Sequence, residues 1–556
     1  MATENKSNAL KRLFRLIKSE KINIKNIFFF AIFSGIINLS LPLGIQAIIN
    51  FLNAGQLSTS WVILVAVVLG GVAFVGLLQI KQLAITETIE QKIFAKAALD
   101  FSFRLPRIKQ TAVQNKYVPE LVNRFFEIMT VQKGLSKILI DFSAATLQII
   151  FGMILLSFYH PLFIVLGAAL ILLTICHLLL LTGPIGLRTS LKNRLYKFKV
   201  AHWLEEIGRA MTTFKLIGNS PLPVEKTDEL VTGYLKSRKK HFRILVWQFS
   251  GMVIFKVLVA AGLIIMGSIL VIDRQINIGQ FVASEIIIVL ILGAVEKLIL
   301  NMDTFYDLLT ALEKVGTVTD LPLESDEGQD LGSTECEKGV QISFNNVTFQ
   351  YPDGHYPVIR HLTFDIAAGE SVCFTGPEGE GKTTALKLLA GLFDNFEGSI
   401  SYNGLPIRSI RLDSLRSLFG DNLNESHIFK GTIEENISAG VASVSQKDIK
   451  WACELVELDE YIATSEMGFQ TNIDPEGTRL PSTIVKKILM ARALAKKPKV
   501  LLIEDNGLHG NEEFRYQFYR SILDKKNGWT VIIISNDRDV VNMCDSKISF
   551  PTDLIY

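Results

Sequence analysis

Residues 371–392 read SVCFTGPEGEGKTTALKLLAGL. An apolar run, a G-x-x-x-x-G-K-[ST] loop and a leucine-rich run follow one another, which predicts a strand, a phosphate-binding loop and a helix. The glycines let the loop curl so that its N–H groups point at phosphate oxygens, and the positive end of the helix lies behind them. The stretch therefore predicts a nucleotide site.

The side chains of this loop have separate expected roles. Lys382 neutralises charge on the β- and γ-phosphates, and the Thr383 hydroxyl can ligate Mg²⁺. We therefore expect ATP and Mg²⁺ as cofactors. The expected nucleotide contacts are Gly376, Pro377, Glu378, Gly379, Glu380, Gly381, Lys382, Thr383 and Thr384.

Short β-rich runs and helical runs surround the loop from about residue 339 onward. QISFNNVTFQY (341–351) predicts two strands, and HLTFDIAAGE (361–370) predicts another. Strands that alternate with helices indicate an α/β domain with parallel strands at its centre. Helices are expected at 382–392 and 484–495, and buried strands at 500–503 and 530–535.

The rest of the chain is apolar enough to suggest a membrane protein. Hydrophobic residues make up 49% of 556 residues, charged residues 20%, and the mean hydropathy is +0.32. Asn26 to Ile80 contains no Asp, Glu, Lys or Arg, and a membrane-spanning helix needs about 20 apolar residues. A net charge of +2 gives no global signal for nucleic acid. The five cysteines lie far apart and indicate neither a disulfide framework nor a zinc site.

The uncharged runs predict six membrane helices in three hairpins, and the basic residues predict their orientation. There are seven Lys/Arg in 1–25, ten in 81–137 and thirteen in 188–243, whereas the turns on the other side hold only Arg274. Basic loops stay in the cytoplasm, so the N-terminus and both long loops are expected there. The helices are expected at about 26–52, 61–80, 138–159, 161–183, 246–272 and 278–302.

The last two predicted membrane helices contain four charged residues: Lys256, Glu285, Glu296 and Lys297. Such residues usually face a bundle interior or a water-filled cavity. They indicate either a substrate or ion pathway, or else an ion pair between helices or helices that project past the bilayer; we favour the second interpretation.

Six membrane helices, two long cytoplasmic loops and a C-terminal phosphate-binding-loop domain together resemble an ABC exporter half-transporter. Residues 276–322 are similar to the sixth helix and linker of exporters of the haemolysin-secretion type. That group works with a periplasmic adaptor and an outer-membrane channel, and many members carry an N-terminal peptidase-like domain. With about 25 residues before the first helix, we expect that domain to be missing.

The resemblance implies an all-α six-helix transmembrane domain and an α/β nucleotide-binding domain of the ABC type. It implies a homodimer, or a heterodimer with a second half-transporter, in a bacterial inner membrane with the ATP-binding domain in the cytoplasm. The expected divisions are a basic N-terminus (1–25), a transmembrane domain (26–318), an acidic linker (319–338) and an ATP-binding cassette domain (339–556).

The resemblance also places landmarks outside the loop. Tyr351 matches the aromatic residue that stacks on adenine, and the alternative is a core tyrosine at the end of a strand. Residues 428–437 (IFKGTIEENI) match the run that follows the family's Q-loop. Residues 105–124 and 204–218 lie where the family has its two coupling helices, which transmit closure of the nucleotide-binding domains. The alternative for both segments is solvated basic helices.

Several catalytic landmarks depart from the family pattern. The signature LSGGQ reads LPSTI at 480–484, and the Q-loop glutamine reads Asn424. Glu504-Asp505 replaces Asp-Glu, so the resemblance makes Glu504 and Asn424 metal-associated and Asp505 a general base that is one methylene short. The switch histidine reads Asn536, which cannot act as a cation. A general base must lie within hydrogen-bond reach of the attacking water, about 2.6–3.2 Å between heavy atoms. Because the Asp505 side chain is one methylene shorter than glutamate, we expect slow hydrolysis.

Two functions follow. The first is an ATP-driven exporter half with weak hydrolysis, which moves a substrate outward. The resemblance favours a protein or peptide, and lipids and drugs stay open. The second is a catalytically impaired scaffold or regulatory subunit of an export complex. The resemblance implies that each ABC site takes its phosphate-binding loop from one domain and its signature from the other. Neither a homodimer nor a heterodimer would therefore have a site in which every motif follows the family pattern.

Overall fold

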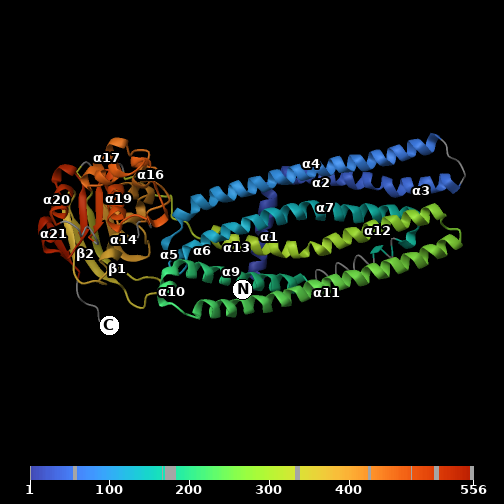
Figure 1. Ribbon diagram of the computed structural model, residues 1–556, viewed down its shortest axis with the longest axis horizontal. Coiled ribbons are helices and arrows are strands. Elements are labelled where there is room, and N and C mark those ends of the chain that lie inside the picture. Colours follow the sequence, from blue (N-terminus) through green and yellow to red (C-terminus); the bar gives the residue numbers. More distant parts are fainter. Residues whose placement is uncertain are drawn as a thin grey trace. The chain divides into compact units, whose positions relative to one another are not determined.

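The computed structural model describes residues 2–53, 59–163, 165, 167, 168, 183–331, 338–423, 427–477, 479–505 and 512–550 (Figure 1). The chain divides into two compact units. The helical unit contains Met1–Pro106 and Asn115–Leu321, and the α/β unit contains Arg107–Gln114 and Pro322–Tyr556.

The helical unit is built from long helices that lie side by side (Figure 1). The two longest are α4, with 46 residues, and α11, with 51. At about 1.5 Å per residue they measure about 69 and 77 Å, more than twice the roughly 30 Å of a hydrocarbon core. The helices therefore extend well beyond the predicted spans. Its principal helices are α1 (Ala2–Ser19), α2 (Lys21–Asn38), α3 (Ser40–Asn53), α4 (Thr59–Arg104), α6 (Val118–Asn123), α7 (Glu127–Tyr159), α9 (Gly183–Arg209), α10 (Met211–Ile217), α11 (Leu222–Ile272), α12 (Ile278–Leu300) and α13 (Met302–Thr319).

Five described segments are long and apolar enough to cross a membrane: Lys21–Leu52, Thr59–Arg107, Val118–Tyr159, Leu222–Ile272 and Ile278–Thr319. They contain five of the six predicted helices. The remaining one, 161–183, falls almost entirely on residues outside the described part of the chain. The predicted helical transmembrane domain is thus confirmed. Its described residues form five candidate spans, whereas six were predicted.

The first span differs from the single predicted helix 26–52. It is divided at Leu39 into α2 and α3. Pro42, in the first turn of α3, has no N–H to donate to the carbonyl of Asn38, four residues earlier. The backbone N–H of Leu39 instead donates to Ile36 O at 3.2 Å.

The charged residues inside the helices include one ion pair between helices. Lys256 Nζ on α11 pairs with Glu296 Oε2 on α12, and each side chain keeps about a third of its exposure. The ion-pair interpretation is therefore confirmed for these two residues. Glu285 is half-buried, and no ion pair joins it to the described residues.

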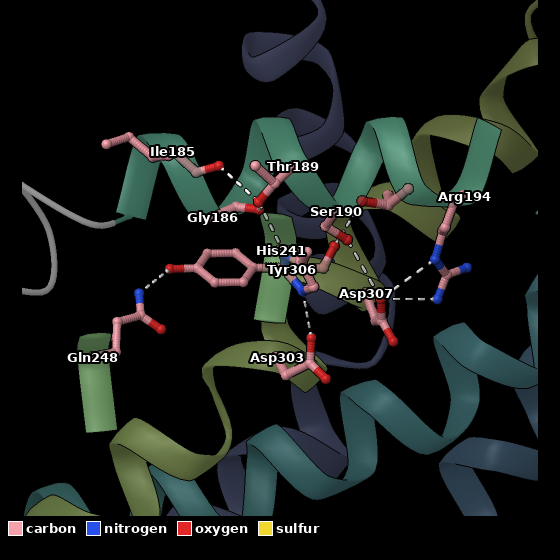
Figure 2. A network of polar contacts seen from close by, with 11 residues as sticks. Ile185, Gly186, Thr189, Ser190, Arg194, His241, Gln248, Asp303, Tyr306 and Asp307 are labelled. Carbon is pink, nitrogen blue, oxygen red and sulfur yellow. Dashed lines mark hydrogen bonds and ion pairs between the residues drawn. The ribbon is translucent and has the colours of Figure 1, made fainter. Parts of the chain in front are cut away.

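A buried polar cluster joins α9, α11 and α13 (Figure 2). His241 is 1% exposed, with Nε2 2.9 Å from Asp303 Oδ1 and Nδ1 2.9 Å from Thr189 Oγ1. One helical turn further along α13, the Tyr306 hydroxyl accepts a hydrogen bond from Gln248 Nε2 at 2.9 Å. Buried polar groups need such partners, so the cluster fixes the three helices to one another.

The α/β unit contains two main sheets. The antiparallel sheet has the order β2-β1-β4-β5, and the parallel sheet has the order β11-β3-β10-β9-β6. Parallel strands at the centre are therefore confirmed. The strands are β1 (Ile342–Phe349), β2 (Ile359–Ile366), β3 (Ser371–Thr375), β4 (Phe396–Tyr402), β5 (Leu405–Pro406), β6 (Phe419–Asn422), β9 (Val500–Glu504), β10 (Thr530–Ile534) and β11 (Ser546–Ser549).

The two strands predicted within 341–351 form one strand, β1. Its register with β2 and β4 shifts near Asn345 and Asn346, and Asn346 has a φ of 51°. Asn tolerates this left-handed conformation, so the pair makes a bulge inside the strand instead of a turn. Both halves of β1 consequently stay paired with β2.

Residues 107–114 of the first predicted coupling segment pack within the α/β unit. Lys109 N donates to Pro322 O at 3.0 Å, and Lys109 Nζ pairs with Asp394 at 2.6 Å. Ile108 and Leu323 form an antiparallel bridge. A short helix, α5 (Gln110–Val113), follows these contacts.

Candidate nucleotide-binding site

The predicted site residues gather where the parallel strands end. The phosphate-binding loop follows β3, Asp505 follows β9 and Asn536 follows β10. These three strands are neighbours in the order β3-β10-β9, so their carboxyl ends share one edge of the sheet. Ligands of open α/β sheets bind at such an edge.

The loop 376–381 has the backbone that the motif predicts. Gly376, Gly379 and Gly381 have φ values of 134°, 90° and 85°. Side chains other than glycine rarely adopt these values, so the glycines allow the curl. The helix α14 (Lys382–Leu389) begins directly after Gly381 and directs its N-terminus at the loop.

Lys382 lies within this curl. Its Nζ donates to Gly376 O at 2.8 Å and to Pro377 O. Burial lowers the pKa of Lys382 below its ordinary value, and the charges of Glu380 and Glu378 act in the opposite direction. The ammonium is thus held by loop carbonyls at the place where phosphate charge is expected.

Glu380 and Glu378 add negative charge to a loop that would bind an anion. Glu378 is exposed, whereas Glu380 is only 7% exposed. The Glu380 Oε2 atom lies 2.6 Å from the position that a Cβ on Gly376 would occupy, and it has no hydrogen-bond partner among the described residues. The sequence predicted a nucleotide contact here, and the structure directs this carboxylate inward, against the loop.

Tyr351 lies beside the loop helix. Its hydroxyl is 3.0 Å from Thr384 Oγ1, and its ring meets Phe349 and Phe393 edge to face at 4.9 and 5.5 Å. The side chain is half-buried. Tyr351 is therefore both a packed residue at the end of β1 and an aromatic ring next to the predicted site, which keeps the adenine-stacking prediction open.

The predicted base, Asp505, takes part in an ion-pair network. Its Oδ2 accepts from Arg515 Nη2 at 2.5 Å and from Ser535 Oγ at 2.7 Å. Arg515 also donates through Nη1 to Asp537 Oδ2 at 2.6 Å. Glu504, the last residue of β9, is 4% exposed. This network could not be predicted from the sequence, because Arg515 lies on a separate helix, α20 (Glu512–Ile522).

Asn536 contacts the phosphate-binding loop directly. Its Oδ1 accepts a hydrogen bond from the backbone N–H of Gly376 at 3.1 Å. The side chain is exposed. An amide oxygen at this position joins the segment after β10 to the loop, but it supplies no positive charge to a phosphate.

The altered signature lies at the start of a helix. The helix α19 (Ser482–Ala495) follows Pro481, and Pro481, Ser482 and Thr483 are exposed. The hydroxyls of Ser482 and Thr483 are thus accessible beside a helix N-terminus, which favours anions. Asn424, predicted at the Q-loop, lies outside the described residues.

Oxygen donors at the sheet edge fit a magnesium ion. Mg²⁺ prefers oxygen ligands, and the Thr383 hydroxyl and Glu504 carboxylate are of this type. Within the described ranges, no group of three or more His, Cys, Asp or Glu side chains could hold a metal ion. Mg²⁺ usually binds through one or two protein oxygens together with phosphate and water, and Thr383 and Glu504 fit that pattern.

Comparisons with known families agree with both units. Residues 359–506 match the family model described as ABC transporter, and residues 24–295 match the ABC transporter transmembrane region. The chain thus contains one segment that matches each of these two domain models, the membrane domain first and the ATP-binding domain after it. The predicted fusion of a membrane domain with an ATP-binding cassette domain is thereby confirmed.

Solved and curated relatives support the same architecture. A bacterial Atm1-family ABC exporter with ATP bound superposes with a TM-score of 0.82 over 96% of this chain and 94% of that chain, at 17% identity, which shows the fold. The ATP-dependent lipid A-core flippase of Methylobacillus flagellatus is 28% identical over 48% of this chain and 46% of its own length. Transport/processing ATP-binding protein ComA of Streptococcus pneumoniae is 26% identical over 54% and 42%. This chain therefore spans less than half the length of these two curated relatives.

Proposed function

We propose that the chain is one half of a dimeric ABC exporter, which couples Mg-ATP binding and slow hydrolysis to outward movement of a substrate. The observation that carries this proposal is the curled loop 376–381, with Lys382 inside it, in a chain whose described residues also include five long apolar helices. The basic loops favour an orientation with the N-terminus and the ATP-binding domain in the cytoplasm, and the resemblance to haemolysin-type exporters favours a bacterial inner membrane.

The site residues have distinct tasks in this proposal. The loop N–H groups and Lys382 bind the phosphates, Tyr351 stacks on the base, and Asp505 accepts a proton from the attacking water. Thr383 and Glu504 would hold Mg²⁺, which neutralises phosphate charge when it is bound. Asp505 is one methylene shorter than glutamate and is already paired, so turnover should be slow.

Dimerisation would complete each nucleotide site. The exposed Ser482 and Thr483 at the start of α19 would face the phosphates held by the loop of the other chain. The partner is either a second copy or a second ABC half-transporter. In a homodimer and in a heterodimer alike, each nucleotide site would have a signature or a base that departs from the family pattern.

The substrate class follows from the resemblance of residues 276–322 to haemolysin-type exporters. It favours a protein or peptide and a periplasmic adaptor. The relatives include a protein named for lipid A-core flipping and proteins named for multidrug transport or resistance. A transport assay should therefore compare a peptide, a lipid and a drug.

A second function is a nucleotide-binding scaffold or regulator without useful catalysis. The ion pair between Asp505 and Arg515 favours it, because the Oδ2 atom of Asp505 is occupied by Arg515 and Ser535 and is not free to orient a water. Here ATP would stabilise a conformation of the export complex, and a partner would supply turnover.

The steady-state Mg-ATPase rate of the purified chain in lipid nanodiscs distinguishes these functions. Lys382→Ala and Asp505→Ala are measured beside it, together with binding of a fluorescent ATP analogue. A slow rate that both variants abolish supports the exporter half. Binding without a rate above that of the variants supports the scaffold, and the absence of binding contradicts both.

A further inference from the structure

Arg515 contacts two carboxylates that lie at the ends of neighbouring strands. From α20 its Nη2 reaches Asp505, after β9, and its Nη1 reaches Asp537, after β10. The Arg515 side chain is 18% exposed and that of Asp505 only 3%. Charge-assisted hydrogen bonds in such surroundings are stronger than those between neutral groups.

These contacts occupy one oxygen of Asp505. Oδ2 accepts from both Arg515 and the Ser535 hydroxyl, at 2.5 and 2.7 Å. Oδ1 is buried and has no hydrogen-bond partner among the described residues. One of the two oxygens of Asp505 is therefore already in use as an acceptor.

The same contacts join Asp505 to the segment that touches the phosphate-binding loop. Asp537 N donates to Ser535 Oγ at 3.1 Å, so the two ends of the network share the Ser535 hydroxyl. Asn536, between these two residues, accepts from Gly376 N–H. Any shift of the loop on phosphate binding would thus act on the segment that holds Arg515.

We propose that Arg515 is a positioning residue that restrains Asp505, and that hydrolysis requires Arg515 to move toward Asp537. This inference rests on the proposed ATP-binding function. In the reaction, Asp505 takes a proton from water, the water oxygen bonds to the γ-phosphorus, and the bond to the β–γ bridging oxygen breaks with release of ADP. Asp537 assists by competing with Asp505 for the guanidinium.

Two substitutions should change turnover in opposite directions. Arg515→Gln frees Asp505, so kcat should rise by about three- to tenfold while KM changes by less than about twofold. Asp537→Asn leaves the guanidinium to Asp505 alone, so kcat should fall by about twofold or more. Asn is also a good helix cap, and Asp537 Oδ1 accepts from the first N–H groups of α21 (Arg538–Met543), so this variant should fold.

The experiment measures Mg-ATPase rates and fluorescent-ATP binding of the full chain in nanodiscs. Arg520→Gln, an exposed arginine on the same helix, is the matched control and should behave like wild type. Arg515→Gln combined with Asp505→Asn should lose the gain, because the gain acts through the base. Arg515→Lys, which cannot hold both carboxylates in a fork, should be intermediate.

The outcomes separate this inference from the proposed function. A kcat of Arg515→Gln at or below wild type, with binding intact, overturns the inference, especially if Arg515→Lys restores the rate. If Arg515→Gln does not fold, an unchanged or higher rate of Asp537→Asn overturns it and a lower rate supports it. If wild type does not bind the ATP analogue, the proposed function itself fails and the inference fails with it.

Discussion

Replacing Glu380 by Gln should tighten nucleotide binding. Its carboxylate is 7% exposed and lies against Gly376 within the loop that would hold the phosphates. Two unit charges about 8 Å apart at an effective dielectric of about 20 repel by about 2 kcal/mol, and physiological salt reduces this to about 1 kcal/mol. The Kd for Mg-ATP should therefore fall about fivefold.

The assay is equilibrium binding of a fluorescent ATP analogue to the full chain in nanodiscs. Glu397→Gln, an exposed change on β4, is the control for the loss of one charge and should leave the Kd unchanged. A Kd of Glu380→Gln equal to or above that of wild type, with an unchanged unfolding temperature, would refute the electrostatic reasoning. An equal decrease in the control would show that only net charge matters.

Three further results are expected. Tyr351→Ala should weaken ATP-analogue binding by about 1 kcal/mol, whereas Tyr351→Phe, which keeps the ring and loses only the contact with Thr384, should bind like wild type; equal losses would exclude stacking. The hydrogen bond from Arg515 holds the pKa of Asp537 below its usual range. The stability that this contact adds is fully present above the unfolded-state pKa of about 3.9, and it is lost as the pH falls through the folded-state pKa. The unfolding temperature of Asp537→Asn should accordingly lie about 2 °C below wild type at pH 6, and the difference should shrink as the pH falls below about 3.9; a constant difference would contradict this. Lys256→Met should lower the unfolding temperature, and Lys256→Met with Glu296→Met should restore much of the loss; no restoration would mean that the pair is not coupled.

The phosphate-binding loop and the apolar spans could be predicted because their signals are local. Three glycines and Lys382 within seven residues specify a curl and a helix start wherever they follow a buried strand. Long runs without charge need a lipid environment regardless of tertiary detail. The parallel centre of the sheet followed from apolar strands that alternate with helices.

Features that depend on packing could not be predicted. The bulge at Asn346 and a hairpin turn have the same local sequence signal, and only the pairing of both halves with β2 decides between them. The break at Leu39 lies inside a long uncharged run, whose local signal is that of a single span. Arg515 meets Asp505 only because α20 places it beside the ends of β9 and β10. The burial of His241 among three helices likewise has no sequence signal.

The most direct test of the central claim is a calorimetric titration of the full chain in nanodiscs with Mg-ATP, beside Lys382→Ala. Wild type should bind about one nucleotide per chain, and Lys382→Ala should bind at least about tenfold more weakly, because it loses the ammonium inside the loop. Equal affinities of the two proteins, or no heat of binding with wild type, would contradict the claim that this loop holds ATP.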